Sequence, residues 1–370
     1  MTDPPLPAAP WKAIVQTAQD IYRDLQAKLG DVLPDAELFL KAEVAAEVLQ
    51  LKAERDAVIL GHNYMEPALF HTVPDFRGDS LELSRRAAET DKSVIVFCGV
   101  RFMAETAKIL NPTKTVLLPT ERGGCSLAAS ITAADVRALR AAYPGVPIVT
   151  YINTYADVKA EVDICCTSSN AAAVVESLKS DTVIFLPDEY LARNIARETG
   201  RHIIVPSVLP GPAGGGTARP DDTTVERTMI GWKGRCEVHE LFTPEDVDDV
   251  RRQFPDVMIL AHPECSPEVT AKADFSGSTT AMIKAVENSK AKRFLLLTEC
   301  SMGDNIVAAN PGKEMLRLCS HRCPHMHEIT LEQTRDSLKY MRWQIDIPED
   351  IRVRALRSVE RMLAVGPKVD

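Results

Sequence analysis

The sequence predicts an α/β protein built from three homologous α/β/α units, each with a short parallel sheet, in a pseudo-threefold arrangement. Two observations predict this fold class. Short apolar runs of strand length alternate with helical segments, which is typical of parallel strands that are buried on both faces. In addition, one ordered pattern occurs three times at a spacing of roughly 90 to 110 residues, which is the size of a small domain.

Each repeat begins with an apolar strand that ends in polar side chains. The first strand, residues 58–60, runs into His62, Asn63 and Tyr64, and residues 146–153 and 258–264 repeat this arrangement. In open α/β sheets, ligands bind just beyond the carboxyl ends of the strands. We therefore expect the acid–base and hydrogen-bonding groups at these strand ends to share one site: His62, Tyr64, Tyr151, Asn153, His262 and Glu264.

Each strand is followed by three further features in the same order. An acidic residue with small hydroxyl residues comes first, then a second apolar strand, and finally a cysteine. Any alternating α/β chain produces some internal likeness, but this ordered set favours a triplicated unit. The acidic residues are Asp79, Asp163 and Asp274, the hydroxyl clusters begin at Ser80, Thr167 and Ser276, the second strands span 93–97, 182–186 and 293–297, and the cysteines are Cys125, Cys236 and Cys323.

The pattern divides the chain into consecutive parts. We predict an N-terminal extension (1–35), unit 1 (36–126), unit 2 (127–236) and unit 3 (237–326), with C-terminal helices in 327–370 packing on unit 1. Helical periodicity is present in residues 11–25, 38–53, 171–178, 281–286 and 338–343, and in a last helix that starts after Pro348. Residues 1–10 and the Gly/Pro-rich insert within 206–226 are predicted to be frayed or disordered.

Composition limits the possible partners and locations. The net charge is −9 and no basic stripe with interleaved aromatics is present, so nucleic-acid binding is not expected. No apolar run reaches membrane-spanning length, and the N-terminus lacks a basic region followed by an apolar core. A cytoplasmic protein with no membrane partner is therefore predicted. In such a compartment the nine cysteines are not expected to form disulfides.

The cysteine that closes each unit is the strongest chemical signal. Cys98, Cys165 and Cys166 fall in or beside apolar strands and suit a core role, whereas Cys125, Cys236, Cys319 and Cys323 lie in loop-like sequence. Structural zinc ligands usually come as close pairs in one module, and no Cys-x-x-Cys pair is present. Single thiolates from three units suit a central [4Fe–4S] cluster with one iron left open as a Lewis acid.

A zinc site remains an alternative interpretation, because Cys319, Cys323, Cys236 and His239 could form a Cys₃His set. The hydroxyl clusters are also open to two interpretations. Residues 168–170 precede a predicted helix, where free backbone N–H groups favour an anion. The same residues are equally natural as helix caps.

The combined motifs resemble the quinolinate synthase family from about Ala57 to Met326. The resemblance implies three α/β/α domains around a [4Fe–4S] cluster. It also implies condensation of iminoaspartate with dihydroxyacetone phosphate, with loss of phosphate and water, to give quinolinate for NAD biosynthesis. The matching motifs include Gly61-His62-Asn63-Tyr64, Tyr151-Ile152-Asn153-Thr154, Thr167-Ser168-Ser169-Asn170, Leu186-Pro187-Asp188, His262-Pro263-Glu264-Cys265, Gly277-Ser278-Thr279 and Thr298-Glu299.

By this resemblance, Cys125, Cys236 and Cys323 are the cluster ligands. Cys323 is preferred to Cys319 because the last ligand of the family is a cysteine followed by proline. Proton transfers are expected of two pairs, Tyr64 with His62 and His262 with Glu264. The residues expected to hold the dicarboxylate or the phosphate, or to face the same cavity, are Ser80, Tyr151, Asn153, Ser168, His239, Ser278 and Thr279.

The resemblance also implies partners beyond the two substrates. A flavin-dependent L-aspartate oxidase is expected to supply the labile imine, and iron–sulfur assembly proteins are expected to deliver the cluster. Two rival functions remain at this stage. One is a different cluster-dependent hydro-lyase, and the other is a structural zinc or cluster-sensing protein in which the cysteines have no catalytic role.

Overall fold

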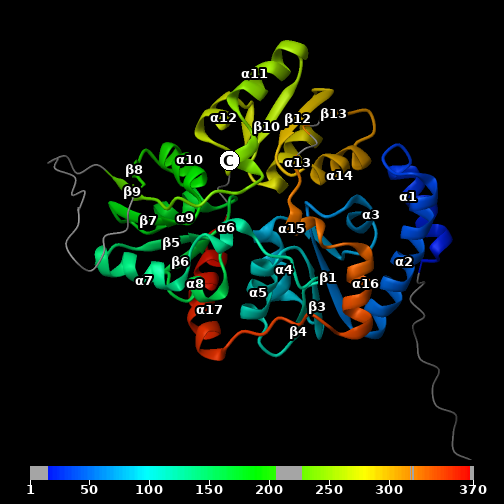
Figure 1. The fold of residues 1–370 in the computed structure, drawn as a ribbon, viewed down its shortest axis with the longest axis horizontal. Coiled ribbons are helices and arrows are strands. Elements are labelled where there is room, and N and C mark those ends of the chain that lie inside the picture. Colours follow the sequence, from blue (N-terminus) through cyan, green and yellow to red (C-terminus); the bar gives the residue numbers. More distant parts are fainter. Residues whose placement is uncertain (1–15, 206–226, 317, 319–320, 367–370) are drawn as a thin grey trace, which may run out of the picture.

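The computed structural model describes residues 16–205, 227–316, 318 and 321–366, which form three lobes that meet at a common centre (Figure 1). Each lobe is built on one sheet, and the named strands of every sheet pair in parallel. The predicted fold class is confirmed. The strands of the first sheet, in spatial order, are β2 (Phe76–Gly78), β1 (Ala57–His62), β3 (Val94–Cys98) and β4 (Thr115–Leu117).

The other two sheets repeat the order of the first three strands, and the second sheet has a fifth strand. The second sheet is β6 (Ile164–Cys166), β5 (Ile148–Tyr151), β7 (Thr182–Leu186), β9 (Thr228–Ile230) and β8 (His202–Ile204). The third is β11 (Phe275–Ser276), β10 (Met258–Ala261), β12 (Arg293–Leu297) and β13 (Glu314–Leu316). In all three, the first strand along the chain lies second in the sheet, between the next two strands, so the carboxyl ends of equivalent strands present equivalent residues.

Helices connect and cover the sheets, as expected for parallel strands. In the first lobe they are α1 (Ala18–Leu29), α2 (Asp35–Glu54), α3 (Pro67–Phe70), α4 (Ser80–Glu89), α5 (Arg101–Leu110) and α6 (Ser126–Ala129). In the second lobe they are α7 (Ala133–Ala142), α8 (Ala156–Lys159), α9 (Ala171–Ser177) and α10 (Glu189–Thr199). The third lobe has η1 (His239–Leu241), α11 (Pro244–Gln253), α12 (Pro267–Lys272), α13 (Thr279–Asn288), α14 (Ser301–Ala309) and α15 (Pro324–His327).

One aspartate in each unit shows the repeat at atomic detail. The Oδ2 atoms of Asp75, Asp163 and Asp274 each accept a hydrogen bond from the backbone N–H of an isoleucine in the first strand, all at 2.8 Å. Each aspartate also donates its own N–H back to the carbonyl of that isoleucine. The equivalent of Asp163 and Asp274 is therefore Asp75, and the sequence-based alignment that placed Asp79 in this set was wrong.

Two helix boundaries also differ from the predictions. The helix predicted from residue 11 begins at Ala18, behind a capping box of Thr17 and Asp20, and continues to Leu29; residues 1–15 lie outside the described chain. The helix predicted over 338–343 is α16 (Leu331–Tyr340), which ends because Met341 adopts a left-handed conformation with φ 48°. The insert 206–226 also lies outside the described residues.

The two C-terminal helices attach to different parts of the molecule. Helix α16 packs against α2 and β3 of the first lobe. Helix α17 (Glu349–Ala364) lies against α8 and β6 of the second lobe and also contacts α5 of the first. The C-terminal segment therefore joins two lobes. Within the described residues, no helix combines the length and the apolar character that a membrane span would need.

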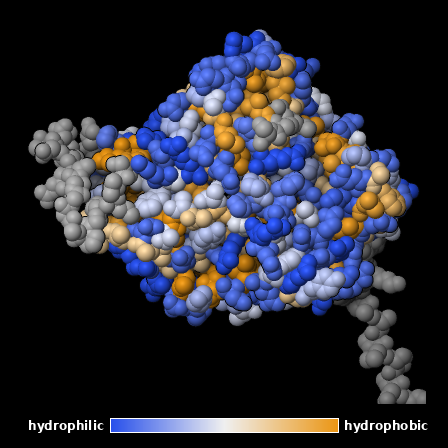
Figure 2. Space-filling model, in the orientation of Figure 1, coloured by the Kyte–Doolittle hydropathy of each residue, from blue (hydrophilic) through white to orange (hydrophobic). Residues whose placement is uncertain are grey.

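The central strands carry the core. All residues of β1, β3 and β5 are buried, which agrees with the prediction of strands covered on both faces. The face of the molecule that Figure 2 shows is mainly hydrophilic, with hydrophobic residues in scattered patches. The apolar material is thus inside the lobes, and the polar strand ends face the centre where the lobes meet.

Candidate functional site

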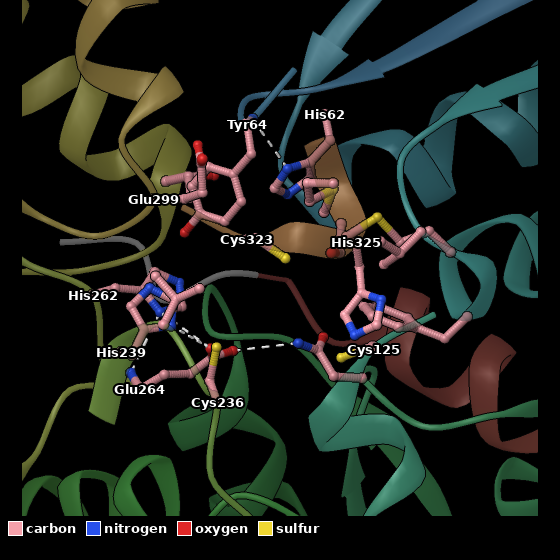
Figure 3. Close-up of a pocket in the computed structure, with 18 of the residues that line it drawn as sticks. His62, Tyr64, Cys125, Cys236, His239, His262, Glu264, Glu299, Cys323 and His325 are labelled. Atoms are coloured by element: carbon pink, nitrogen blue, oxygen red, sulfur yellow. Dashed lines mark hydrogen bonds and ion pairs between the residues drawn. The ribbon is translucent and has the colours of Figure 1, made fainter. Parts of the chain in front are cut away.

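A cavity of about 70 Å³ lies where the three lobes meet, at the carboxyl ends of the first strands (Figure 3). It is lined by residues from all three units, as the strand-end rule predicts. Of the proposed site residues, Ser278 is not among the lining residues. Those that line it are His62, Tyr64, Ser80, Cys125, Tyr151, Asn153, Ser168, Cys236, His239, His262, Glu264, Thr279 and Cys323.

The three loop cysteines occupy equivalent places. Each follows a strand on the same side of its sheet (β4, β9 or β13) and comes just before a short helical turn: α6, η1 or α15. Cys125 and Cys323 are the N-cap residues of α6 and α15. In Figure 3 their side chains and that of Cys236 approach the cavity from different elements. Each unit therefore contributes one sulfur to the cavity.

The electrostatic surroundings of the three sulfurs are also alike. Burial raises the pKa of the Cys125 thiol to about 12 and that of Cys323 to about 11, and it raises the pKa of Cys236 well above its usual value. In each case, the backbone N–H groups two and three residues further along the chain oppose this rise. Three partly buried cysteines whose sulfurs face N–H dipoles need only a bound cation to become stable thiolates.

These observations fit a metal cluster held by three thiolates. The zinc alternative requires Cys319, which lies outside the described residues. The geometry of a Cys₃His set that includes Cys319 is therefore not described. The cores of the lobes hold the other predicted set of cysteines: Cys98, Cys165 and Cys166 are fully buried, as predicted. All eight cysteines in the described part of the chain are free.

His62 and His262 form a second matched pair. The Nδ1 atom of His62 accepts the N–H of Tyr64 at 3.2 Å, and Nδ1 of His262 accepts the N–H of Glu264 at 3.4 Å. Burial lowers the pKa of His62 to about 4 and that of His262 to about 3. Both rings are therefore neutral near pH 7 with the proton on Nε2, and they offer N–H donors rather than charged acids.

Two buried carboxyl groups near this pair have pKa values that are shifted in opposite directions. Burial, and then the charge of Glu264, raises the pKa of Asp188 well above its usual value. Burial would also raise the pKa of Glu264, but the neighbouring His239 and His262 lower it below its usual range. Glu264 is therefore the ionised group and a proton acceptor in the cavity, whereas the pKa of Asp188 is shifted in the opposite direction.

Thr298 connects two of the cavity residues, His239 and Tyr64, and was assigned no role from sequence. Its hydroxyl lies 3.0 Å from Nε2 of His239 and also forms a hydrogen bond with the hydroxyl of Tyr64. On the other side of the same ring, Nδ1 of His239 lies 2.7 Å from Oε2 of Glu264. This contact is close in distance but lacks hydrogen-bond geometry. Burial of Tyr64 raises its pKa well above 10, so the phenol keeps its proton.

Glu299, the next residue, lines the cavity and was also missed. Its burial raises its pKa to about 7, against the opposing effect of the Ser301 backbone N–H. Thr298 and Glu299 come directly after β12, so the rule that polar residues at strand ends face the site could have found them.

The hydroxyl residues have unequal surroundings. Thr279 accepts a hydrogen bond from the Asn63 amide at 2.9 Å, which links the first lobe to the third. Ser80 follows the carboxylate of Asp79, which accepts from Leu81, Glu82 and the hydroxyl of Ser169. A carboxylate at this helix start is unfavourable for an anion.

The caps also differ between units. Ser278 caps α13 by accepting from the N–H of Ala281, so it has a structural role at a place that does not line the cavity. Asn170 stands at the N-cap position of α9 without a side-chain capping bond. Its amide instead donates to the carbonyls of Met362 and Val365 at the C-terminal end of α17, so the capping interpretation was wrong for Asn170.

Comparison with known proteins identifies relatives over nearly the whole chain. Residues 46–364 match the family model described as quinolinate synthetase A protein. "Quinolinate synthase 2" of Mesorhizobium japonicum is 54% identical over 318 residues, which cover 86% of this chain and 90% of the relative. "Quinolinate synthase" of Agrobacterium fabrum is 49% identical over 355 residues, covering 96% of this chain and 95% of the relative.

Proposed function

We propose that this chain, which belongs to the quinolinate synthase family, condenses iminoaspartate with dihydroxyacetone phosphate to form quinolinate, releasing phosphate and water. The observation that carries the proposal is the convergence of one cysteine from each of three repeated units on a single cavity. A site divided among three domains in this way suits one shared polynuclear group better than a local structural zinc.

We assign Cys125, Cys236 and Cys323 as the residues that would hold a [4Fe–4S] cluster. When bound, such a cluster supplies an iron without a protein ligand, which is a Lewis acid for a substrate hydroxyl or carboxylate. The backbone N–H groups that face each sulfur would stabilise the thiolate form that a cluster requires.

The chain's own residues supply proton transfer. Glu264 is ionised, so it accepts a proton as the carbon framework isomerises, and Tyr64 keeps its proton and donates it to a leaving oxygen. The Nε2–H groups of His62 and His262 hold developing negative charge on oxygen without bringing a full positive charge into the cavity.

The remaining lining groups bind and orient. Asn153 donates to Oε1 of Glu264 at 3.4 Å and thereby fixes the carboxylate. Tyr151 and Ser168 lie in the same wall of the second lobe and would hold the dicarboxylate of iminoaspartate. Neutral donors of this kind bind anions through hydrogen bonds, which suits a site that must also release inorganic phosphate.

The chemistry of the substrates defines the partners. Iminoaspartate is a labile imine, so an oxidase that acts on L-aspartate would supply it, and iron–sulfur assembly proteins would load the cysteines. A protein with these partners would act in the cytoplasm.

Replacement of Tyr64 by Phe tests the proposal in an anaerobic assay with the two substrates. We expect quinolinate formation to fall at least tenfold, since general acid catalysis contributes about 10²- to 10⁴-fold. The visible absorption of the cluster should be unchanged. Tyr340→Phe, at a side chain that is 60% exposed, is the matched control. Near-normal turnover by Tyr64→Phe would remove Tyr64 from the chemistry, and a wild type without quinolinate formation would favour a different hydro-lyase.

A further inference from the structure

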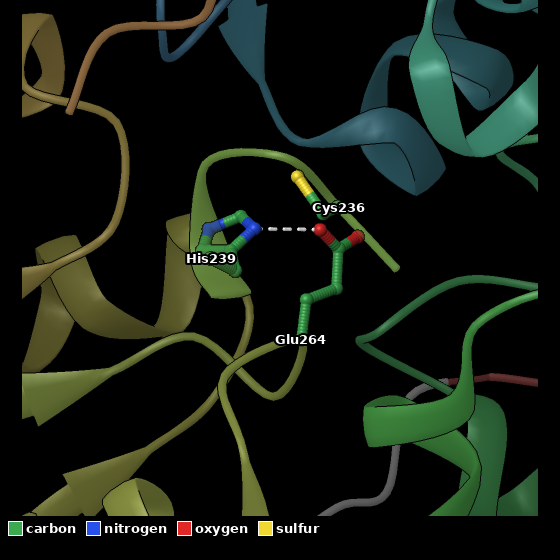
Figure 4. Close-up of side chains that lie close together, drawn as sticks. All are labelled: Cys236, His239 and Glu264. Carbon is green, nitrogen blue, oxygen red and sulfur yellow. Dashed lines mark ion pairs between the residues drawn. The ribbon is translucent and has the colours of Figure 1, made fainter. Parts of the chain in front are cut away.

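We propose that Cys236, His239 and Glu264 form a binding site for a single divalent metal ion of the zinc class when no cluster is bound. Their ligand atoms, one sulfur, one imidazole nitrogen and one carboxylate oxygen, all lie within 4.8 Å of one another (Figure 4). Zn²⁺ and Co²⁺ take this mixture of ligands, and three protein ligands with one open position are common for zinc. Only Cys236 belongs to both this site and the cluster site.

The contact between His239 and Glu264 already has nearly the spacing that a metal needs. Nδ1 and Oε2 lie 2.7 Å apart without hydrogen-bond geometry, and both side chains are buried at 3% exposure. Metal–nitrogen and metal–oxygen bonds of about 2.1 Å in a tetrahedral site place such atoms about 3.4 Å apart. A small rotation of the Glu264 side chain would increase the distance between Nδ1 and Oε2 to this value.

Both residues also have the outer partners that metal ligands usually have. Nε2 of His239 lies 3.0 Å from the hydroxyl of Thr298, which can accept an N–H and so leave Nδ1 free for the metal. Oε1 of Glu264 accepts from the Asn153 amide, which leaves Oε2 on the side of His239. Such second contacts orient ligands in metal sites and typically contribute 10- to 100-fold in affinity.

Binding of the metal ion releases protons and excludes the cluster. The metal replaces the thiol proton of Cys236 and any proton on Nδ1 of His239, and these protons go to the solvent. Because one sulfur would serve both groups, the single ion and the cluster would exclude each other. This exclusion rests on the proposed cluster, whereas the metal site itself does not.

Titration of the full-length, iron-free protein with Co²⁺ under anaerobic conditions tests the site. We expect one Co²⁺ per chain and a thiolate-to-cobalt charge-transfer band with the intensity of one thiolate. Cys236→Ser should remove the band, and His239→Asn and Glu264→Gln should each weaken binding at least tenfold. His325→Asn is the matched control, because His325 lines the same cavity outside the trio.

The double variant Cys125→Ser/Cys323→Ser separates this site from a three-thiolate site and should bind Co²⁺ as the wild type does. Loss of the band in that double variant, its persistence in Cys236→Ser, or no Co²⁺ binding by the wild type would overturn the proposal. Equal thermal unfolding midpoints of the iron-free variants establish that they are folded. If Cys236→Ser does not fold, Glu264→Gln and the double variant still decide the outcome.

Competition between the single metal ion and the cluster is measured in a separate experiment. One equivalent of Zn²⁺ added before anaerobic cluster reconstitution should lower the visible cluster absorption of the wild type and of His325→Asn. The same addition should lower the cluster absorption of Glu264→Gln much less. Equal reconstitution with and without Zn²⁺, together with normal Co²⁺ binding, would contradict the exclusion and leave the metal site standing.

Discussion

The hydroxyl of Thr298 lies 3.0 Å from Nε2 of His239, in the buried space between the third sheet and the cavity. The same hydroxyl forms a hydrogen bond with that of Tyr64, which comes from the first lobe. Because a hydroxyl can donate and accept at once, Thr298 can fix both rings in place. It is therefore a positioning residue for the proposed proton donor Tyr64 and for His239.

Replacement of Thr298 by Val should lower kcat about tenfold, since loss of one hydrogen bond to a reacting group costs about 1.4 kcal/mol. KM should change less, because Thr298 does not line the cavity. Steady-state kinetics with both substrates under anaerobic conditions provide the measurement.

Thr298→Ser keeps the hydroxyl and is the control. It should recover most of the activity, with the same cluster absorption as the wild type. If the Ser and Val variants lose activity equally, the methyl group and its packing matter rather than the hydrogen bonds, and the positioning role would be wrong.

Asp274→Ala should destabilise the third lobe by about 1–3 kcal/mol, because it leaves the buried backbone N–H of Ile259 without its acceptor. Denaturant unfolding measures the difference. Asp248→Ala removes a carboxylate of the same lobe that is 54% exposed and pairs with Lys272 on the surface. That change should cost less than about 1 kcal/mol. If the two changes lower the free energy of unfolding equally, the hydrogen bond between Asp274 and the backbone of Ile259 does not stabilise the lobe.

The buried histidines predict acid sensitivity. Burial lowers the pKa of His71 to about 4, and His62 and His262 behave alike, so the folded protein binds fewer protons than the unfolded chain between pH 6.5 and 4. Their contribution to stability is therefore complete above pH 6.5 and is lost as the pH falls through this window.

His71 lies outside the cavity and allows a clean test. His71→Gln should reduce the loss of unfolding free energy between pH 7 and pH 5 by about 1 to 2 kcal/mol, given about 1.4 kcal/mol per pH unit for one group. The exposed His202 is the control, and His202→Gln should leave the pH dependence unchanged. An unchanged slope in His71→Gln would show that His71 does not stay neutral in the folded protein.

Much of the site could be predicted because its residues follow apolar strands directly. His62, Tyr151 and His262 each stand at or just after the end of the first strand of a unit, where periodicity alone marks the strand and its carboxyl end marks the site. The cysteines were recognisable for a similar reason, because a polar, Gly- and Pro-containing context separates them from the core cysteines.

The remainder depends on contacts that spacing does not reveal. Asp75 and Asp79 both precede helix α4, and only the backbone N–H of Ile59 shows which of them is the structural equivalent of Asp163. The opposite pKa shifts of Asp188 and Glu264 arise because the second and third units pack together. Helix α16 ends at a left-handed Met341, a conformation that side-chain type does not predict.

The central claim is that one sulfur from each unit holds a shared iron–sulfur group. Iron analysis and visible absorption of anaerobically purified protein test it most directly, on the wild type and on Cys→Ala variants of Cys125, Cys236, Cys323 and Cys319. We predict about four irons per wild-type chain, loss of the cluster in the first three variants and retention in Cys319→Ala. A colourless wild type loaded with zinc, or a cluster that survives in any of the three variants, would contradict this account.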